Sequence, residues 1–268
     1  MPAVEIGDVT VHYEQAGRGE PVLLIPGTGA RGRSWRLHQV PALVEAGYHA
    51  LTLDNRGVGQ SGPAKPGLTI HDLVADVVVV IETVLGRPCR LVGSSMGAYI
   101  VQELLVARPE LCRQAVLMAS RARPDAFSRA LAAAERNLFD SAVSLPADYD
   151  AVTRAMQNLS PRTLNDDLAV RDWLDVFELS PADRADPGQR AQLDVVLDTD
   201  RRPAYRSIRV PTLVISFADD LVAPPPRGRE LASTIPSARY VEIPDAGHYG
   251  YLEQPEAANA AMLDFFAA

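Results

Sequence analysis

Short apolar runs that alternate with helical stretches are the feature that most limits the fold of this 268-residue chain. The runs that we predict to be buried strands are residues 22–25, 50–53, 90–92, 115–118, 212–216 and 239–243. An alternating pattern on both sides of Gly7-Asp8 predicts an antiparallel hairpin ahead of them. Strands at helix-sized spacings favour a mostly parallel sheet with helices on both faces. The sequence therefore predicts an α/β fold with about eight strands.

Helical periodicity fills the segments between these strands. Helices are predicted over residues 35–46, 70–85, 96–107, 227–235 and 255–266. Residues 121–208 differ, because their apolar residues fall at three- and four-residue spacings that prolines interrupt. This pattern predicts an insertion of about four short helices on the sheet domain. We expect residues 1–120 and 209–268 to form the two parts of a core domain and residues 121–208 to form a cap.

Charge and composition exclude several function classes. The formal net charge is −8, which argues against a nucleic-acid partner, since such a protein needs a basic surface to neutralise phosphates. The one lysine, Lys65, lies in a Pro/Gly-rich stretch, which argues against lysine Schiff-base chemistry and a phosphate-binding P-loop. Cys89 and Cys112 are too few for a disulfide framework or a cysteine-rich zinc site. We therefore expect no metal and no organic cofactor.

The location of the protein is predicted from its apolar segments and cysteines. The first residues have neither the basic nor the apolar region of a signal peptide. The longest strongly apolar run, residues 77–81, is far shorter than the roughly 20 residues of a membrane helix. We expect a cytoplasmic protein without a membrane contact. The sequence leaves the oligomeric state open.

The pentapeptide GSSMG at residues 93–97 follows a predicted strand and opens a predicted helix. This is the context of the G-x-S-x-G nucleophile turn, in which the central serine takes a strained backbone conformation. The residues two before and two after that serine must lack a side chain, which glycine provides. The pattern predicts that Ser95 is a nucleophile at the carboxyl edge of the sheet.

A serine hydroxyl needs a base, and the base needs an acceptor that fixes its tautomer. His248 follows the last predicted strand and is the predicted general base, whereas the other four histidines are expected to be surface or packing residues: His12, His38, His49 and His71. Two carboxylates follow the strand at 212–216, and we prefer Asp220 over its neighbour Asp219. The chain order is then Ser95, Asp220, His248, which is the order of one hydrolase architecture.

Two backbone N–H groups are predicted to stabilise a developing oxyanion. One belongs to Met96, which follows the nucleophile at a helix N-terminus. The other is assigned to Thr28 in the loop after the strand at 22–25. That loop is also glycine-rich, but it lacks the lysine and the spacing of a phosphate-binding loop.

Taken together, these residues resemble the α/β-hydrolase superfamily over nearly the whole chain. Residues 54–61, DNRGVGQS, are similar to its D-x-R-G-x-G-x-S loop. Residues 219–224 match its acid loop, and residues 245–248 resemble its histidine loop. The insertion at 121–208 falls where the family carries its cap. The resemblance implies the α/β-hydrolase fold and, with Ser95 in the nucleophile position, the serine branch.

The main functional hypothesis is hydrolysis of a small-molecule ester or other carbonyl compound through an acyl-enzyme. A second hypothesis is a non-hydrolytic enzyme on the same scaffold: carbon–carbon cleavage or formation, lyase, perhydrolase or cofactor-free oxygenase chemistry. A third is a ligand-binding protein without catalysis. Acyl trapping on Ser95 would favour the first of these.

Two groups of residues are candidates for substrate contact. The aromatic candidates for an apolar acyl pocket, which could equally be core residues, are Trp35, Tyr99, Phe139, Trp173, Phe177, Tyr249 and Tyr251. The second group is a set of arginines near the expected mouth: Arg31, Arg33, Arg121 and Arg123. These arginines either recognise an anionic substrate or are solvated surface, and the second interpretation is the simpler one.

Overall fold

The fold is built on one sheet, seen in a computed structural model that describes residues 2–141, 143–179, 186–195, 198–236 and 238–268. The strand order among these residues is β1-β2-β4-β3-β5-β6-β7-β8. The strands are β1 (Ala3–Ile6), β2 (Val9–Gly17), β3 (Glu20–Ile25), β4 (Tyr48–Leu53), β5 (Cys89–Ser94), β6 (Cys112–Met118), β7 (Thr212–Phe217) and β8 (Ala238–Ile243). β2 pairs antiparallel with β1 and β4, and the pairs from β4 through β8 are parallel. The predicted hairpin and eight-stranded α/β sheet are confirmed.

Helices cover both faces of the sheet because successive strand residues point to opposite sides. In β3, Leu23 and Ile25 enter one apolar core while Val22 and Leu24 enter the other. The helices on the first core are α2 (Ile70–Val80), α3 (Met96–Ala107) and α10 (Pro225–Thr234). The helices on the second core are α1 (Gln39–Glu45), α11 (Gly250–Glu253) and α12 (Pro255–Ala267). Residues of the central strands are buried on both faces, as in other parallel sheets.

The helix ends follow from local sequence. α2 starts with the predicted cap, since Thr69 and Asp72 form a reciprocal capping box. A π-helical turn, Ile81–Leu85, continues α2 to Gly86, whose φ of 63° ends it in the left-handed conformation. The predicted helix at 35–46 is instead a 3₁₀ turn, Gly32–Arg36, followed by α1. Pro41 lies in the first turn of α1, where its missing N–H breaks no helical hydrogen bond.

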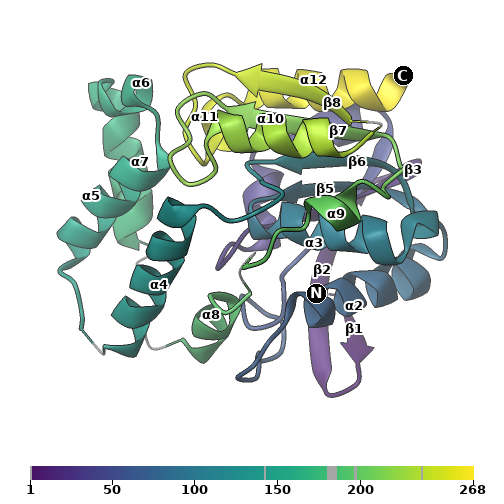
Figure 1. The fold of residues 1–268 in the computed structure, drawn as a ribbon, viewed down its shortest axis with the longest axis horizontal. Coiled ribbons are helices and arrows are strands. Elements are labelled where there is room, and N and C mark those ends of the chain that lie inside the picture. Colours follow the sequence, from purple (N-terminus) through teal and green to yellow (C-terminus); the bar gives the residue numbers. More distant parts are fainter. Residues whose placement is uncertain (1, 142, 180–185, 196–197, 237) are drawn as a thin grey trace.

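The segment between β6 and β7 is helical, as predicted, but holds more helices than the four expected. They are α4 (Ala126–Asp140), α5 (Ala147–Asn158), α6 (Pro161–Leu164), α7 (Asp167–Leu179), α8 (Pro187–Gln192) and α9 (Arg202–Tyr205). Figure 1 shows α4 to α7 gathered to one side of the sheet. Residues 180–185 and 196–197 of this segment lie outside the described residues. The division into core and cap at residues 120 and 208 stays a prediction.

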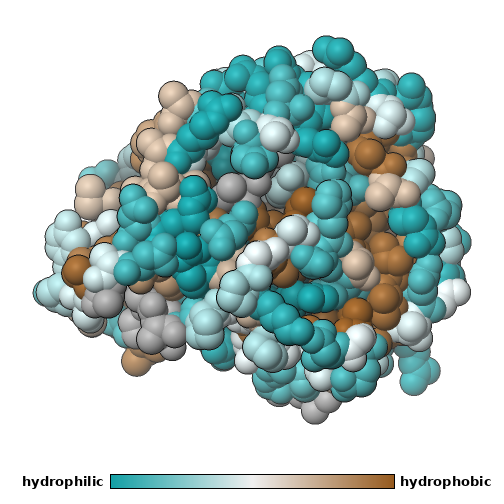
Figure 2. All heavy atoms as spheres, turned by 60° about the horizontal axis from the view of Figure 1, so that its bottom comes forward, coloured by the Kyte–Doolittle hydropathy of each residue, from teal (hydrophilic) through white to brown (hydrophobic). Residues whose placement is uncertain are grey.

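The face drawn in Figure 2 carries both hydrophilic and apolar residues, with the apolar ones gathered mainly toward the right of the view. Hydrophilic residues cover much of this face. Within the described ranges, none of the helices combines the length and the apolar character that crossing a bilayer requires. A 3₁₀ turn, Pro109–Leu111, completes the secondary structure ahead of β6.

Candidate active site

Three predicted site residues meet at one edge of the sheet. Parallel strands bring the loops that follow them to the same edge. Ser95 follows β5, Asp220 follows β7, and His248 follows β8. The parallel sheet therefore brings these three residues together although they are far apart in the chain.

Ser95 lies on a sharp turn between β5 and α3. Its φ of 54° and ψ of −119° are unusual for a residue with a side chain and cost about 1–3 kcal/mol. A Cβ on Gly93 would overlap the carbonyl of Gly97, and a Cβ on Gly97 would overlap the carbonyl oxygen of Ile25. The two glycines of the GSSMG pentapeptide are thus required by close backbone approach.

A hydrogen-bonded chain links the three side chains. His248 Nε2 lies 3.1 Å from Ser95 Oγ, and His248 Nδ1 lies 2.8 Å from Asp220 Oδ2. The carboxylate of Asp220 accepts a hydrogen bond from His248 Nδ1–H, which leaves Nε2 free to accept the proton of the serine hydroxyl. Asp220 is 1% exposed, and its second oxygen accepts the N–H groups of Val222 and Ala223, each at 2.8 Å. Of the two acidic candidates, Asp220 and not Asp219 contacts the imidazole.

Both residues predicted to supply oxyanion donors lie beside Ser95. Thr28 and Met96 both line the pocket that Ser95 enters. Met96 is the first residue of α3, so its N–H has no acceptor within the helix. A Cβ on Gly27 would come 3.2 Å from the Cβ of Ser95, which indicates that glycine keeps the space beside the hydroxyl open. The arrangement suits a negative charge that develops on a carbonyl oxygen bound there.

The loop that carries Thr28 is held from two directions. Asn55, in the DNRGVGQS motif, donates its Nδ2–H to the carbonyl of Pro26 at 3.1 Å. Gln192, at the end of α8, accepts the N–H of Gly29 at 2.8 Å and donates to the carbonyl of Arg56 at 2.8 Å. Gln192 is 1% exposed, so these bonds are shielded from water. Sequence analysis missed this residue, because no motif surrounds it.

Glu253 fixes the loop of His248 and connects it to the helical segment between β6 and β7. Its Oε2 accepts the N–H of Gly247 at 2.7 Å. Its Oε1 accepts the N–H of Ser160 at 2.8 Å and the hydroxyl of Thr163 at 2.6 Å. One carboxylate in α11 thus joins the histidine loop to the start of α6. Sequence analysis missed it too, since a single glutamate after the histidine carries no pattern of its own.

The pocket beside the triad is small. Its volume is about 90 Å³, and its lining includes Ser95, His248, Tyr99 and Arg121. Typical ligand pockets hold about 300–1,000 Å³, so this one suits a small part of a substrate. In the part of the chain that the structure describes, no three His, Cys, Asp or Glu side chains are placed to hold a metal ion.

Of the aromatic residues predicted for the substrate pocket, Tyr99 lines this cavity. The others do not line it: Trp35, Phe139, Trp173, Phe177, Tyr249 and Tyr251. Trp35 is fully buried and packs against Tyr251 at 4.6 Å between ring centroids in the second core, so its predicted role is wrong. Trp173, Phe177 and Tyr249 form a cluster with centroid distances of 5.5–6.2 Å. That cluster joins cap helix α7 to the histidine loop, and Phe139 is a half-buried residue of α4.

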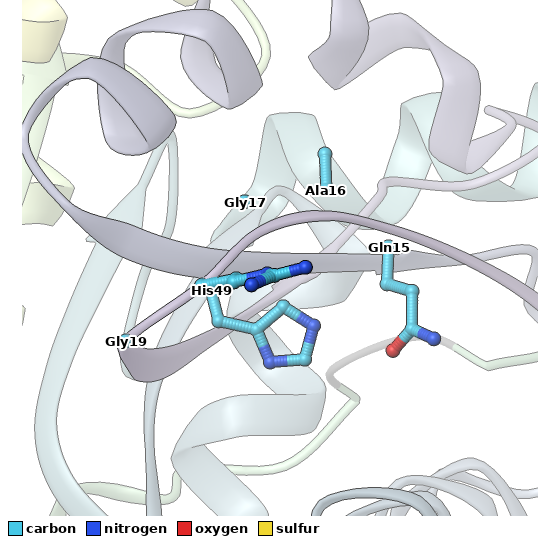
Figure 3. A pocket seen from close by; sticks show the side chains of 6 residues that line it. Gln15, Ala16, Gly17, Gly19 and His49 are labelled. Atoms are coloured by element: carbon cyan, nitrogen blue, oxygen red, sulfur yellow. The ribbon is translucent and has the colours of Figure 1, made fainter.

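A second, larger pocket lies at the opposite edge of the sheet. It has a volume of about 470 Å³ and is lined by residues 15–19 and His49 (Figure 3). His49 is at the start of β4 and pairs with Gly17 at the end of β2. The amino ends of the parallel strands lie here, so this pocket is remote from Ser95. It contains none of the three triad residues.

Comparison with known proteins agrees with this geometry. A model of the alpha/beta hydrolase family matches residues 22–261. The chain is 51% identical over 260 residues to "Putative non-heme bromoperoxidase BpoC" of Mycobacterium tuberculosis, covering 97% of this chain and 98% of that protein. It is 28% identical over 270 residues to "Putative carbamate hydrolase RutD" of Azorhizobium caulinodans, covering 99% and 98%.

Solved structures give the same result. The crystal structure of BpoC from M. tuberculosis H37Rv superposes with a TM-score of 0.93 at 51% identity, covering 96% of this chain and 95% of that one. The enol-lactonase of Burkholderia xenovorans LB400 superposes with a TM-score of 0.80 at 26% identity over all of both chains. The chain therefore belongs to the alpha/beta hydrolase family, as a hydrolase or a related enzyme of that fold.

Proposed function

We propose that the protein is a serine hydrolase of small carbonyl substrates. The observation that carries the proposal is the pair of contacts of 3.1 Å and 2.8 Å that joins Ser95 to His248 and His248 to Asp220. His248 takes the hydroxyl proton while Ser95 attacks the carbonyl carbon, and Asp220 stabilises the imidazolium that forms. The N–H groups of Thr28 and Met96 hold the oxyanion, and each such donor lowers the barrier by about 3–4 kcal/mol.

The reaction then proceeds through an acyl-enzyme. The imidazolium of His248 gives its proton to the leaving group as the bond to the carbonyl carbon breaks. A water molecule, deprotonated by the same imidazole, attacks the ester of Ser95. Collapse of the second tetrahedral intermediate returns the proton to Ser95 and releases the acid, so the enzyme is regenerated unchanged.

The substrate class follows from the size of the pocket and from the relatives. A cavity of about 90 Å³ favours short acyl groups over long ones. The names of RutD of A. caulinodans and of the B. xenovorans enol-lactonase also describe enzymes that act on carbonyl compounds. We include a small molecule as the only partner in this proposal, with neither nucleic acid nor membrane. The two free, buried cysteines support a reducing compartment such as the cytoplasm.

A perhydrolase is the second candidate, because the BpoC relatives carry the name of a non-heme bromoperoxidase. The same acyl-enzyme would be attacked by hydrogen peroxide in place of water. The products are a peracid and free Ser95, and the peracid oxidises bromide while returning to the acid. Bromination of a dye by the enzyme with acetate, peroxide and bromide would favour this candidate if its rate exceeded that of ester hydrolysis.

The test of the proposal is the Ser95→Ala variant on p-nitrophenyl esters of rising acyl length. We expect kcat to fall by about 10⁵- to 10⁶-fold with an unchanged circular dichroism spectrum. Ser207→Ala is the matched control, since Ser207 is exposed and bonds only the carbonyl of Ala204. A serine-reactive phosphonate should add to Ser95 of the wild type. Retention of most activity by Ser95→Ala would refute the mechanism, and neither turnover nor labelling in the wild type would favour a ligand-binding protein.

A further inference from the structure

Arg121 is the permanently charged side chain in the lining of the catalytic pocket. It is the third residue after β6, and it lines the same cavity as Ser95 and His248. The rest of the described lining is apolar or uncharged apart from the imidazole. A charge placed this close to the reacting atoms acts on whatever part of the substrate enters the cavity.

The four arginines expected near the mouth have different surroundings. Arg31 and Arg33 are exposed, as a solvated surface requires. Arg123 is half-buried, and its Nε donates to Glu230 at 2.9 Å. Arg121 is also half-buried, but no carboxylate of the described residues forms an ion pair with it. Of these four arginines, only Arg121 is partly buried, lines the pocket and has no acidic contact partner among the described residues.

The described residues use only part of the hydrogen-bonding capacity of the Arg121 side chain. Its Nη1 donates to the carbonyl of Val222 at 2.9 Å. A guanidinium has five N–H donors in a planar fork, so most of them have no acceptor among the residues that the structure describes. None of its nitrogens is among the fully buried atoms without a partner, so the remaining donors are accessible on a side chain that lines the pocket.

Neighbouring charges only partly offset the burial of the Arg121 guanidinium, so a bound anion would stabilise this cation. Burial lowers the pKa of Arg121, while Asp125, Asp220 and Glu135 oppose this shift from a distance. Arg227 adds to the lowering by like-charge repulsion. Asp220 is occupied by His248 and two backbone N–H groups, so it is not free to pair with the guanidinium. A partly desolvated cation without an acidic contact partner is stabilised when a ligand supplies the anion.

We infer that Arg121 binds a carboxylate of the substrate, and that the preferred substrates are small esters or related acyl compounds whose acyl part carries that carboxylate. This inference rests on the proposed function. The planar fork of the guanidinium matches a carboxylate in a two-bond contact. The carboxylate lies within a few atoms of the scissile carbonyl, because one cavity of about 90 Å³ contains both Arg121 and Ser95.

The test compares two esters of nearly the same shape. Monomethyl succinate carries the carboxylate, and methyl 4-methylpentanoate has two methyl groups in its place. In the wild type we expect the higher kcat/KM for the succinate ester, measured by acid release at constant pH. In Arg121→Gln the ratio of the two kcat/KM values should fall by about 10- to 100-fold, the usual effect of a hydrogen bond between charged groups. Arg123→Gln is the matched control and should keep the ratio.

A binding measurement separates this inference from the proposed function. Succinate should bind the wild type in a calorimetric titration, and Arg121→Gln should weaken that binding at least tenfold. If neither ester is cleaved but succinate binding depends on Arg121, the anion site stands and hydrolysis fails. If both esters are cleaved and neither the ratio nor succinate binding changes, hydrolysis stands and the anion site fails. An equal loss for both esters with unchanged succinate binding would mean that Arg121 only supports the loop of Val222.

Discussion

The Glu253→Gln variant tests how His248, the proposed general base, is held in position. The carboxylate of Glu253 accepts three hydrogen bonds, from the N–H of Gly247, the N–H of Ser160 and the hydroxyl of Thr163, at 2.6–2.8 Å. In Glu253→Gln one oxygen becomes an NH₂ group. Whichever way the amide turns, at least one backbone N–H then faces a donor and loses its acceptor. The substitution keeps the shape of the side chain and changes only its hydrogen bonding.

The expected magnitude follows from those bonds. An N–H left without an acceptor costs about 1–3 kcal/mol, and the bonds that remain weaken because the acceptor is no longer charged. We expect the free energy of unfolding to fall by about 2–4 kcal/mol in total, which corresponds to a Tm lower by about 5–15 °C. Gly247 precedes His248, so the imidazole also loses its fixed position. A displacement of about 1 Å costs on the order of 100-fold in rate, and we expect kcat to fall by about 10- to 100-fold.

The assay measures Tm by calorimetry and kcat with a short p-nitrophenyl ester at a temperature where the variant is folded. Glu256→Gln is the control, because Glu256 is exposed three residues further on at the start of α12. It should change the free energy of unfolding by less than about 1 kcal/mol. A Glu253→Gln variant with the Tm and kcat of the wild type would show that Glu253 does not position His248.

Three further predictions concern the loops and the core. Gly97→Ala should abolish soluble expression or lower Tm by more than about 10 °C, since its Cβ meets a carbonyl oxygen of β3 that cannot move. Gln192→Ala removes the acceptor of Gly29 N–H and should lower kcat about tenfold with a smaller change in KM, measured by steady-state kinetics. Burial raises the pKa of Cys89 to about 12, and it also raises the pKa of Cys112. Both thiols should therefore resist a disulfide reagent in the native protein and react fully in guanidinium, whereas rapid labelling of the folded chain would contradict their burial.

The fold could be predicted because local sequence patterns mark its strands and helix ends, and these patterns recur along the chain. Each central strand is a short apolar run, and the capping box at Thr69 and the glycine at position 86 mark the ends of one long helix. The meeting of Ser95, Asp220 and His248 could be predicted because parallel strands bring their following loops to one edge. The break before α1 was missed, although Pro41 signals that a helix starts close to it.

The substrate pocket could not be predicted in the same way, because an aromatic residue at helical spacing looks identical whether it faces a core or a cavity. Trp35 packs on Tyr251 in the core, while the cavity is lined by Arg121, which looked like one of several surface arginines. What separates Arg121 from Arg123 is whether an acidic side chain more than a hundred residues away contacts it. Such pairing depends on the placement of α10 beside the loop after β6, which no local pattern specifies. The proposed substrate specificity thus depends on contacts between distant segments, whereas the proposed chemistry depends on motifs that each lie within one loop.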